Sequence, residues 1–322
     1  MIEIIKRFLK STFLFKYYDS YRRRERRISN GNDNPDKTYY VIGPSDPQSG
    51  LFWLINIVLM HISYAEKKGY IPIVDMKNNI TQYLDPSLLH KENAWEYFFQ
   101  QPCGITLNDI SSSKNIILSK KDACPNSDHF MGNFYDNEIW INHFRDLFSR
   151  YIKPQPHILQ NLESSYKSIL GGKRVVGVLC RGTDYITKKP TGHPIPPTPK
   201  QVIEKTKEIQ KSYNCNYVFL ATEDEDIFNT FLNEFGEYLL YNTQDRIRRA
   251  DVRSGEYLST ARLRNGGTVD YRKRNGLQYY EAIYLLSKCN CFISARCGGA
   301  KGVLLMNNGF EYKYIFNLGM YK

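Results

Sequence analysis

The chain has 322 residues, of which 42% are hydrophobic and 24% are charged. This composition excludes a wholly disordered chain, a collagen-like repeat and a coiled coil, and the length predicts two domains of ordinary size. No apolar run reaches the ~18–20 residues needed to span a bilayer, and we expect no signal peptide. Seven irregularly spaced cysteines indicate a reducing compartment, so we expect a cytoplasmic protein.

The net charge of +11 is concentrated in two segments. Residues 1–30 hold nine Lys or Arg against three Asp or Glu, and residues 246–274 hold the same numbers. A nucleic-acid-binding protein usually spreads its positive charge over a whole face. The distribution here therefore argues against nucleic acid and indicates two separate anionic partners, the alternative being that both stretches are simply solvated.

The first segment is predicted to be a basic amphipathic arm and linker over residues 1–36. Apolar residues recur at helical spacing between positions 4 and 14, with basic residues between them. Such an arm, over residues 1–27, suits an anionic membrane surface and would place the protein peripherally on the inner face of the membrane. The alternative is that the helix packs on the body of the protein.

Strands and helices then alternate, which predicts an N-terminal α/β domain over 37–170 and a C-terminal Rossmann-like domain over 171–322. In the first domain we expect strands at 39–43, 71–75 and 115–119, a helix at 51–68, and broken helices over 137–170. In the second we expect strands at 174–180, 217–221, 238–241, 291–294 and 314–318, and helices at 199–211, 225–235, 276–287 and 299–306. Two such domains facing each other across a cleft would bind a ligand between them.

The first polar strand end is Cys180-Arg181-Gly182-Thr183-Asp184-Tyr185, directly after an apolar strand. Ligands of open α/β sheets gather at the carboxyl ends of the strands. Arg181 could hold a phosphate bidentately, and the glycine after it would let the ligand approach the backbone. Asp184 could orient that arginine or act as a base, and the alternative is a purely structural ion pair between the two.

The second polar strand end is Ala221-Thr222-Glu223-Asp224-Glu225-Asp226. Carboxylates only accept hydrogen bonds, which suits the diol of a ribose or the N–H edge of guanine. The alternative is capping of the following helix, which needs only one of these side chains. We assign ligand contact first to Glu223, and capping to Asp224 or a later residue.

The third polar strand end runs from Ser294 through Gly298 and Gly299 into a helix. A glycine pair there exposes free N–H groups that favour a phosphate, and together with Arg181 it indicates a nucleotide diphosphate. Neither the P-loop nor the GxGxxG fingerprint is present. No HExxH or paired CxxC sequence is present either, so we expect no metal site.

His193 lies in the proline-rich loop Thr191-Gly192-His193-Pro194-Ile195-Pro196-Pro197, soon after the arginine motif. A histidine that titrates near neutrality could serve there as a general base or donate a hydrogen bond. The alternative is a loop histidine bonded to a backbone carbonyl.

These motifs resemble those of the fucosyltransferase superfamily, which comprises α1,2-, α1,6- and protein O-fucosyltransferases and their bacterial relatives. Residues 178–185 resemble the family motif H-x-R-R-G/T-D-Y/K, and His193-Pro194-Ile195 resembles its H-P-I. Residues 220–224 are similar to its A-T-D-D segment, and residues 286–299 to its final L-S-x-x-D-x-x-x-x-x-x-S-S run. The resemblance covers residues 175–305.

The resemblance implies a GT-B-like fold of two Rossmann-like domains, of which 37–170 would lie on the acceptor side and 171–322 would bind the nucleotide-sugar. It also implies an inverting, metal-independent glycosyltransferase that uses a GDP-sugar and no further cofactor. Arg181 would hold the β-phosphate and stabilise the departing GDP, and Asp184 or His193 would deprotonate the acceptor hydroxyl. The residues that it assigns to the donor are Arg181, Thr183, Glu223, Asp224, Glu281, Ser294, Gly298 and Gly299.

The chain departs from the family motif at three positions. Leu179 stands in place of the histidine, Gly182 in place of the second arginine, and Lys189 near the downstream acidic residue. From the resemblance as a whole we expect transfer of a sugar, fucose first choice, to a glycan or lipid-linked glycan, as in bacterial capsule or O-antigen assembly. The alternative is a protein of the same fold that binds a nucleotide or an anionic glycan without turnover.

Overall fold

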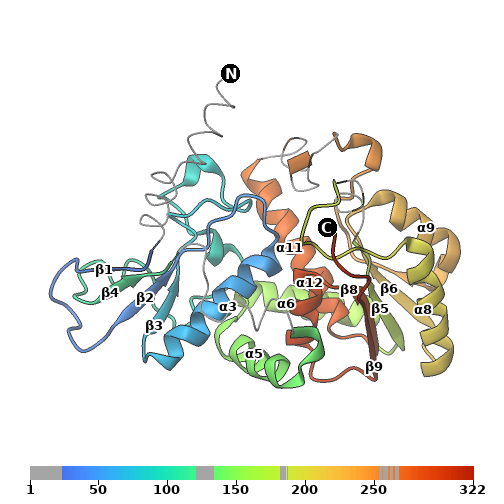
Figure 1. Cartoon of the computed structure of the whole chain (residues 1–322), viewed down its shortest axis with the longest axis horizontal. Coiled ribbons are helices and arrows are strands. Elements are labelled where there is room, and N and C mark those ends of the chain that lie inside the picture. Colours follow the sequence, from blue (N-terminus) through green and yellow to red (C-terminus); the bar gives the residue numbers. More distant parts are fainter. Residues whose placement is uncertain are drawn as a thin grey trace.

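The computed structural model describes residues 24–120, 134–181, 186, 188–253, 256, 260–261, 264 and 268–322. The fold is α/β, with two separate sheets and a layer of helices between them (Figure 1). The first sheet has the strand order β1-β4-β2-β3, and the second has the order β7-β6-β5-β8-β9. The prediction of two α/β units in tandem is confirmed.

The N-terminal lobe is built on a single βαβ unit, β2-α3-β3, whose strands pair in parallel. Its regular elements are β1 (Arg26–Ile28), β2 (Tyr39–Ile42), α3 (Leu51–Lys67), β3 (Ile71–Val74), β4 (Ile116–Leu118), α5 (Glu138–Tyr151) and α6 (Pro156–Ser165). Short helical turns add Pro86–Leu88, Ala94–Tyr97, Phe134–Asp136 and Tyr166–Leu170. Wherever the hydrophobic pattern predicted a helix or strand, the observed element lies close to the predicted range.

The predicted boundary of the arm at residue 36 is wrong, because β1 belongs to the first sheet. Strand β1 pairs antiparallel with β4, and Asn30 donates a backbone hydrogen bond to Ser113 at 3.1 Å. The strand is only three residues long, exposed and rich in arginine, so its pairing could not be seen in a hydrophobic pattern. The rest of the arm, residues 1–23, lies outside the described residues.

One face of the first sheet packs on α3, whereas the other is covered by a loop rather than a helix. Alternate residues of β2 divide between the two faces, with Tyr40 and Ile42 turned to the central core and Tyr39 and Val41 to a small cluster with residues 105–110. The N-terminal sheet thus has a helix layer on one face only.

The C-terminal lobe has helices on both faces of a parallel sheet. Its regular elements are β5 (Val175–Leu179), α8 (Pro199–Tyr213), β6 (Tyr217–Ala221), α9 (Glu225–Phe235), β7 (Leu239–Leu240), α11 (Val269–Leu286), β8 (Cys291–Ala295), α12 (Gly298–Met306) and β9 (Tyr312–Phe316). Helix α11 begins at Val269 rather than at the predicted 276, because Thr268 caps it and its interior Gly276 does not interrupt it.

Strand β5 is apolar along its whole length because both of its faces are covered. Val176 and Val178 pack with α8 and α9, whereas Val175 and Leu179 join the core beneath α11 and α12. Gly177 faces α11, where a Cβ would lie 2.9 Å from the Cys289 sulfur. The apolar run Val-Val-Gly-Val-Leu thus forms a strand that is buried between two helical layers.

The two lobes share one core across their boundary. A Cβ at Gly302 of α12 would overlap the Phe52 ring of α3, and one at Gly276 of α11 would overlap the Phe98 ring. Arg272 of α11 donates a hydrogen bond to the Gln82 carbonyl at 2.9 Å and lies 3.6 Å from the Asp85 carboxylate. This close packing fixes the carboxyl ends of the two sheets relative to each other.

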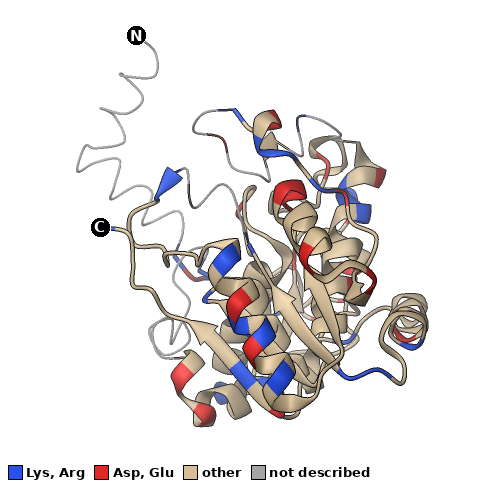
Figure 2. Ribbon diagram, turned by 90° about the vertical axis from the view of Figure 1, so that its right-hand side faces the viewer, with Lys and Arg blue, Asp and Glu red and all other residues tan. Residues whose placement is uncertain are grey.

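Within the described part of the chain, every helix is too short or too polar to cross a membrane. Basic and acidic residues are interspersed along the ribbon of the outer helices of the C-terminal lobe (Figure 2). Along these helices the two signs of charge are mixed, whereas a nucleic-acid-binding helix usually carries clustered Lys and Arg.

Candidate functional site

Two strand-to-helix turns, one from each lobe, meet at the centre of the molecule. The turn from β2 into α3 and the turn from β8 into α12 approach so closely that a Cβ at Gly298 would lie 3.3 Å from the Trp53 nitrogen. Each turn follows the carboxyl end of a parallel strand. The carboxyl ends of the two sheets thus converge, as expected for a ligand site between two α/β units.

Arg181 lies directly after β5 and reaches toward the end of β6. Its Nε lies 3.4 Å from the Glu223 Oε1, and the two side chains are 37% and 23% exposed. The guanidinium is therefore held at the strand ends by a long ion pair and is not turned into the core. A guanidinium carries five N–H donors, and one at this strand end can contact an anion that approaches from solvent.

Asp224 caps helix α9, which is the role that the sequence left open for it. Its carboxylate accepts backbone hydrogen bonds from Asp226 and Ile227 at 2.9 and 3.0 Å. The side chain is fully buried and also lies 3.3 Å from the Arg249 guanidinium. The Asp224 carboxylate thus has a structural role within the fold. The side chain of Glu223 is more exposed than that of Asp224.

The basic segment is anchored across the end of β6. Ile247 exchanges backbone hydrogen bonds with Glu223 and Glu225 at 3.0 and 3.1 Å. Its neighbour Arg246 lies over the Phe228 ring, with the guanidinium carbon 3.8 Å from the ring centroid. This strand-like contact places the basic segment directly beside the second polar strand end.

Most described arginines of that segment contact the protein itself, and the predicted anionic partner of the segment stays a prediction. Besides the contacts of Arg246, Arg249 and Arg272 given above, Arg264 pairs with Glu256 at 3.1 Å and Arg274 pairs with Asp245 at 3.2 Å. The charge count could not show these partners, because most of them lie outside the segment, and of the ion pairs between described residues only the Arg264–Glu256 pair is formed within it.

The glycine pair opens helix α12 at the junction of the lobes. Cys297 is the N-cap residue, and its sulfur accepts the Ala300 N–H at 3.4 Å. A Cβ at Gly298 would be in tight contact with α3, whereas one at Gly299 would overlap the hydroxyl of Tyr279. Ser294, one residue from the end of β8, is buried and donates a hydrogen bond to the Ala295 carbonyl at 2.9 Å.

Two polar groups near this junction, the half-buried Tyr279 of α11 and the buried Lys301 of α12, were not singled out in the sequence. Lys301 of α12 is only 4% exposed, and its ammonium lies over the rings of Phe134 and Tyr135, with ring centroids 5.5 and 5.8 Å away. Burial lowers the pKa of Lys301 to about 7. Only the packing of α12 on the N-terminal lobe reveals this environment.

The remaining predicted residues divide into two groups. Glu281 accepts hydrogen bonds from Asn242, at 2.8 Å, and from the Ser165 hydroxyl, so its carboxylate ties α11 to α6 and to the end of β7. His193 is exposed on a loop, and its backbone carbonyl accepts a hydrogen bond from the Tyr321 N–H at 2.9 Å. Thr183 and Asp184 lie outside the described residues.

The N-terminal lobe contributes a polar rim that the sequence did not single out. Asp75 follows β3 and accepts backbone hydrogen bonds from Lys77 and Asn78 at 2.9 and 2.8 Å. Asp46 precedes α3 and accepts the Ser49 hydroxyl at 2.6 Å. Both carboxylates shape turns at the carboxyl ends of their strands, on the edge of the sheet that faces the other lobe.

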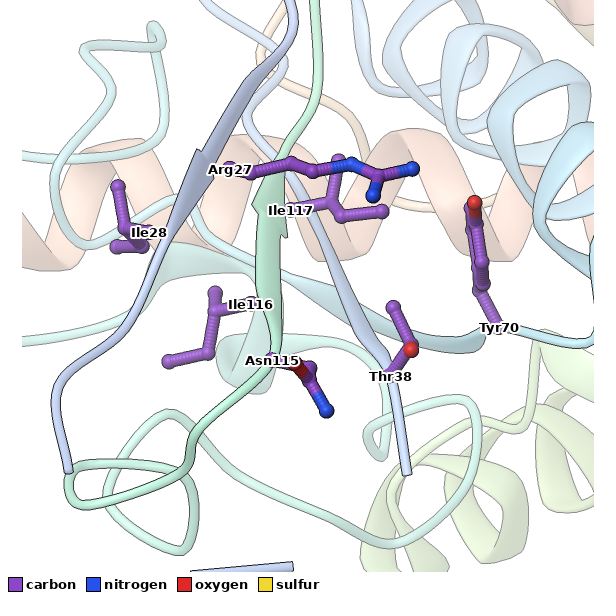
Figure 3. A pocket seen from close by; sticks show the side chains of 7 residues that line it. All are labelled: Arg27, Ile28, Thr38, Tyr70, Asn115, Ile116 and Ile117. Carbon is purple, nitrogen blue, oxygen red and sulfur yellow. The ribbon is translucent and has the colours of Figure 1, made fainter. Parts of the chain in front are cut away.

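A separate cavity of about 240 Å³ lies at the other edge of the first sheet. Its lining residues are Arg27, Ile28, Thr38, Tyr70, Asn115, Ile116 and Ile117, and the Arg27 guanidinium extends toward the Tyr70 ring (Figure 3). Because Thr38 and Asn115 precede their strands, this cavity is remote from the carboxyl ends where Arg181 lies. Among the described residues, no group of three His, Cys, Asp or Glu side chains could hold a metal ion.

The fold is similar to that of known fucosyltransferase structures. The fucosyltransferase NodZ from Bradyrhizobium aligns with a TM-score of 0.50 at 15% identity, over 83% of this chain and 92% of that one. NodZ α-1,6-fucosyltransferase co-crystallised with GDP gives the same TM-score and identity, over 84% and 93%. POFUT1 in complex with GDP aligns with a TM-score of 0.49 at 10% identity, over 87% and 98%.

No protein-family model matches the sequence, and a search of curated proteins finds no match. The similarity is therefore one of fold. This chain has the GT-B-like architecture of the fucosyltransferase NodZ, as its motifs predicted, along nearly the full length of both chains.

Proposed function

We propose that this protein is an inverting glycosyltransferase that transfers a sugar, fucose first choice, from a GDP-sugar to a glycan acceptor. The observation that carries the proposal is the position of Arg181 at the carboxyl end of β5, beside Glu223, in the fold of a fucosyltransferase that was co-crystallised with GDP. The opening of α12 at Gly298 supports it, because free N–H groups at a helix start favour a phosphate.

In the proposed reaction the bond between the sugar C1 and the β-phosphate oxygen breaks, and its electron pair stays with GDP. The acceptor oxygen forms a bond to C1 from the opposite face, and its proton passes to a base, for which Asp184 and His193 are the candidates. Arg181 stabilises the charge that develops on the leaving diphosphate. This side chain takes the part that a divalent cation plays elsewhere, so we expect transfer without a metal.

Glu223 is proposed to contact the nucleoside, because its carboxylate is partly exposed beside Arg181. Asp224 is proposed to act indirectly, by holding the turn and Arg249 in place. The acceptor is proposed to bind on the N-terminal side, where Asp46 and Asp75 shape the rim that faces the second sheet.

We further propose that the acceptor is a glycan or a lipid-linked glycan of a bacterial capsule or O-antigen. A basic arm over residues 1–27 supports a peripheral position on the inner face of the membrane, where lipid-linked intermediates are found. The protein would then act from the cytoplasm.

Donor binding is the first test. Thermal unfolding of the full chain is measured with GDP-, UDP-, CMP- and dTDP-sugars, and only the GDP-sugar is expected to raise the melting temperature. Release of GDP is then measured in mixtures of GDP-fucose with glycan acceptors, with and without EDTA. Binding of GDP-fucose without release in the presence of any acceptor would support the alternative of a binding protein, and binding of none would reject the proposal.

A further inference from the structure

The hydroxyl of Tyr279 lies at the junction where the proposed donor would bind. Tyr279 belongs to α11, and its hydroxyl oxygen occupies the space that a Cβ at Gly299 would need. A methyl group of Leu179 borders the same space, and Leu179 precedes Arg181 by two residues. The phenol is therefore wedged between the end of β5 and the first turn of α12.

The ring of Tyr279 is held firmly by the N-terminal lobe. It packs edge-on against Phe52 of α3, with the ring centroids 5.7 Å apart and an interplanar angle of 81°. Because Phe52 is fully buried, the ring has one well-defined position. The hydroxyl is thus placed by contacts from three elements of the fold, α3, α11 and α12.

The side chain of Tyr279 is half-buried, and its hydroxyl makes no hydrogen bond to any residue within the described part of the chain. The hydroxyl oxygen does not belong to the fully buried polar atoms without a partner, so water or a ligand can reach it. Arg181, Glu223 and the Cys297 thiol are near enough to act on it electrostatically. Such a hydroxyl can donate its hydrogen bond to a ligand that enters beside Arg181.

We propose that Tyr279 is a further catalytic residue, which donates a hydrogen bond to an oxygen of the β-phosphate of the leaving nucleoside diphosphate. This inference rests on the proposed function. The phenolic proton stays on Tyr279 throughout, while Arg181 neutralises the charge of the same group. Burial raises the pKa of Tyr279 well above its usual value, so the group remains a donor at neutral pH.

The test compares the ligands GDP and GMP, which differ by one phosphate. Binding of each is measured by calorimetry to the full chain, to Tyr279→Phe and to the control variant Tyr280→Phe. The phenylalanine keeps the ring on Phe52 and removes only the hydroxyl. Tyr280, the next residue of α11, is buried against Phe52 and Phe99 and serves as the matched control.

We expect Tyr279→Phe to weaken GDP binding about tenfold and GMP binding less than twofold, and to lower the rate of sugar transfer at saturating donor by at least about tenfold. Tyr280→Phe is expected to leave the ratio of the two affinities unchanged. Equal effects of Tyr279→Phe on GDP and GMP, or no effect on either, would overturn the inference. Failure of the unaltered protein to bind GDP would instead reject the proposed function itself.

Discussion

Arg181 and Glu223 occupy equivalent places on adjacent parallel strands. Leu179 of β5 and Ala221 of β6 are register partners, so the residues two positions beyond them emerge side by side, 3.4 Å apart at their charged groups. A one-residue shift of this register would turn one of the two side chains to the other face of the sheet. The pairing of the strands thus creates the charged pair on which the proposed site depends.

Replacing Arg181 by alanine is expected to lower kcat/KM for sugar transfer about 100-fold, which corresponds to ~2–3 kcal/mol of transition-state stabilisation. Arg181→Lys keeps the charge but not the planar arrangement of donors. Its kcat/KM is expected to lie between the values of the unaltered enzyme and of Arg181→Ala. The surface variant Arg274→Ala is the control, since its ion pair is exposed. Turnover of Arg181→Ala within a factor of three of the unaltered enzyme would refute the assigned role.

Gly302→Ala is expected to destabilise the protein by about 1–3 kcal/mol, because the added Cβ would overlap the Phe52 ring at the boundary of the lobes. Urea unfolding measures the change. Combining Gly302→Ala with Phe52→Leu is expected to cost less than the sum of the single variants, since the smaller side chain relieves the overlap. A stabilisation by Gly302→Ala, as at an open helix position, would show that the lobes are not in close contact there.

The buried side chain of His61 is expected to make the folded protein less stable in acid. It is buried in α3, where Tyr40 is hydrogen-bonded to its Nδ1 at 2.8 Å, and burial lowers its pKa to about 4. Between pH 6.5 and 4 the unfolded chain binds the proton and the folded chain does not, so the free energy of unfolding falls as pH falls through this window. Relative to His61→Gln, the unaltered protein is expected to lose up to about 3 kcal/mol between pH 7 and pH 4. If the curves of unfolding free energy against pH ran parallel for the unaltered protein and for His61→Gln, this role of His61 would be contradicted.

Deletion of residues 1–23 is expected to abolish binding to vesicles that contain anionic lipids, because it removes much of the positive charge of the arm. Co-sedimentation with vesicles of neutral and of anionic lipid measures the effect. The deletion should leave the melting temperature unchanged, whereas deletion of residues 1–30 also removes β1 and its pairing with β4 and should lower it. Unchanged vesicle binding after deletion of residues 1–23 would exclude the arm as the membrane contact.

The architecture was largely predictable, whereas the partners of the charged residues were not. The buried strand Val175–Leu179 and the capped helix Pro199–Tyr213 follow from apolar runs, proline position and capping residues, which act over a few neighbouring positions. The pairing of Glu281 with Ser165 spans more than a hundred positions, and no local pattern encodes it. The same holds for Arg272 and the Gln82 carbonyl.

The sequence by itself determined the order of strands and helices, the polar ends of three strands, and the resemblance that led to the fucosyltransferase fold. Only the tertiary structure decided which of those polar groups are used within the fold, as for Asp224, and which remain partly exposed, as for Arg181. It also brought Tyr279 to the opening of α12. Local patterns record which face of an element is buried, but the neighbour that covers that face is chosen by the packing of the whole chain.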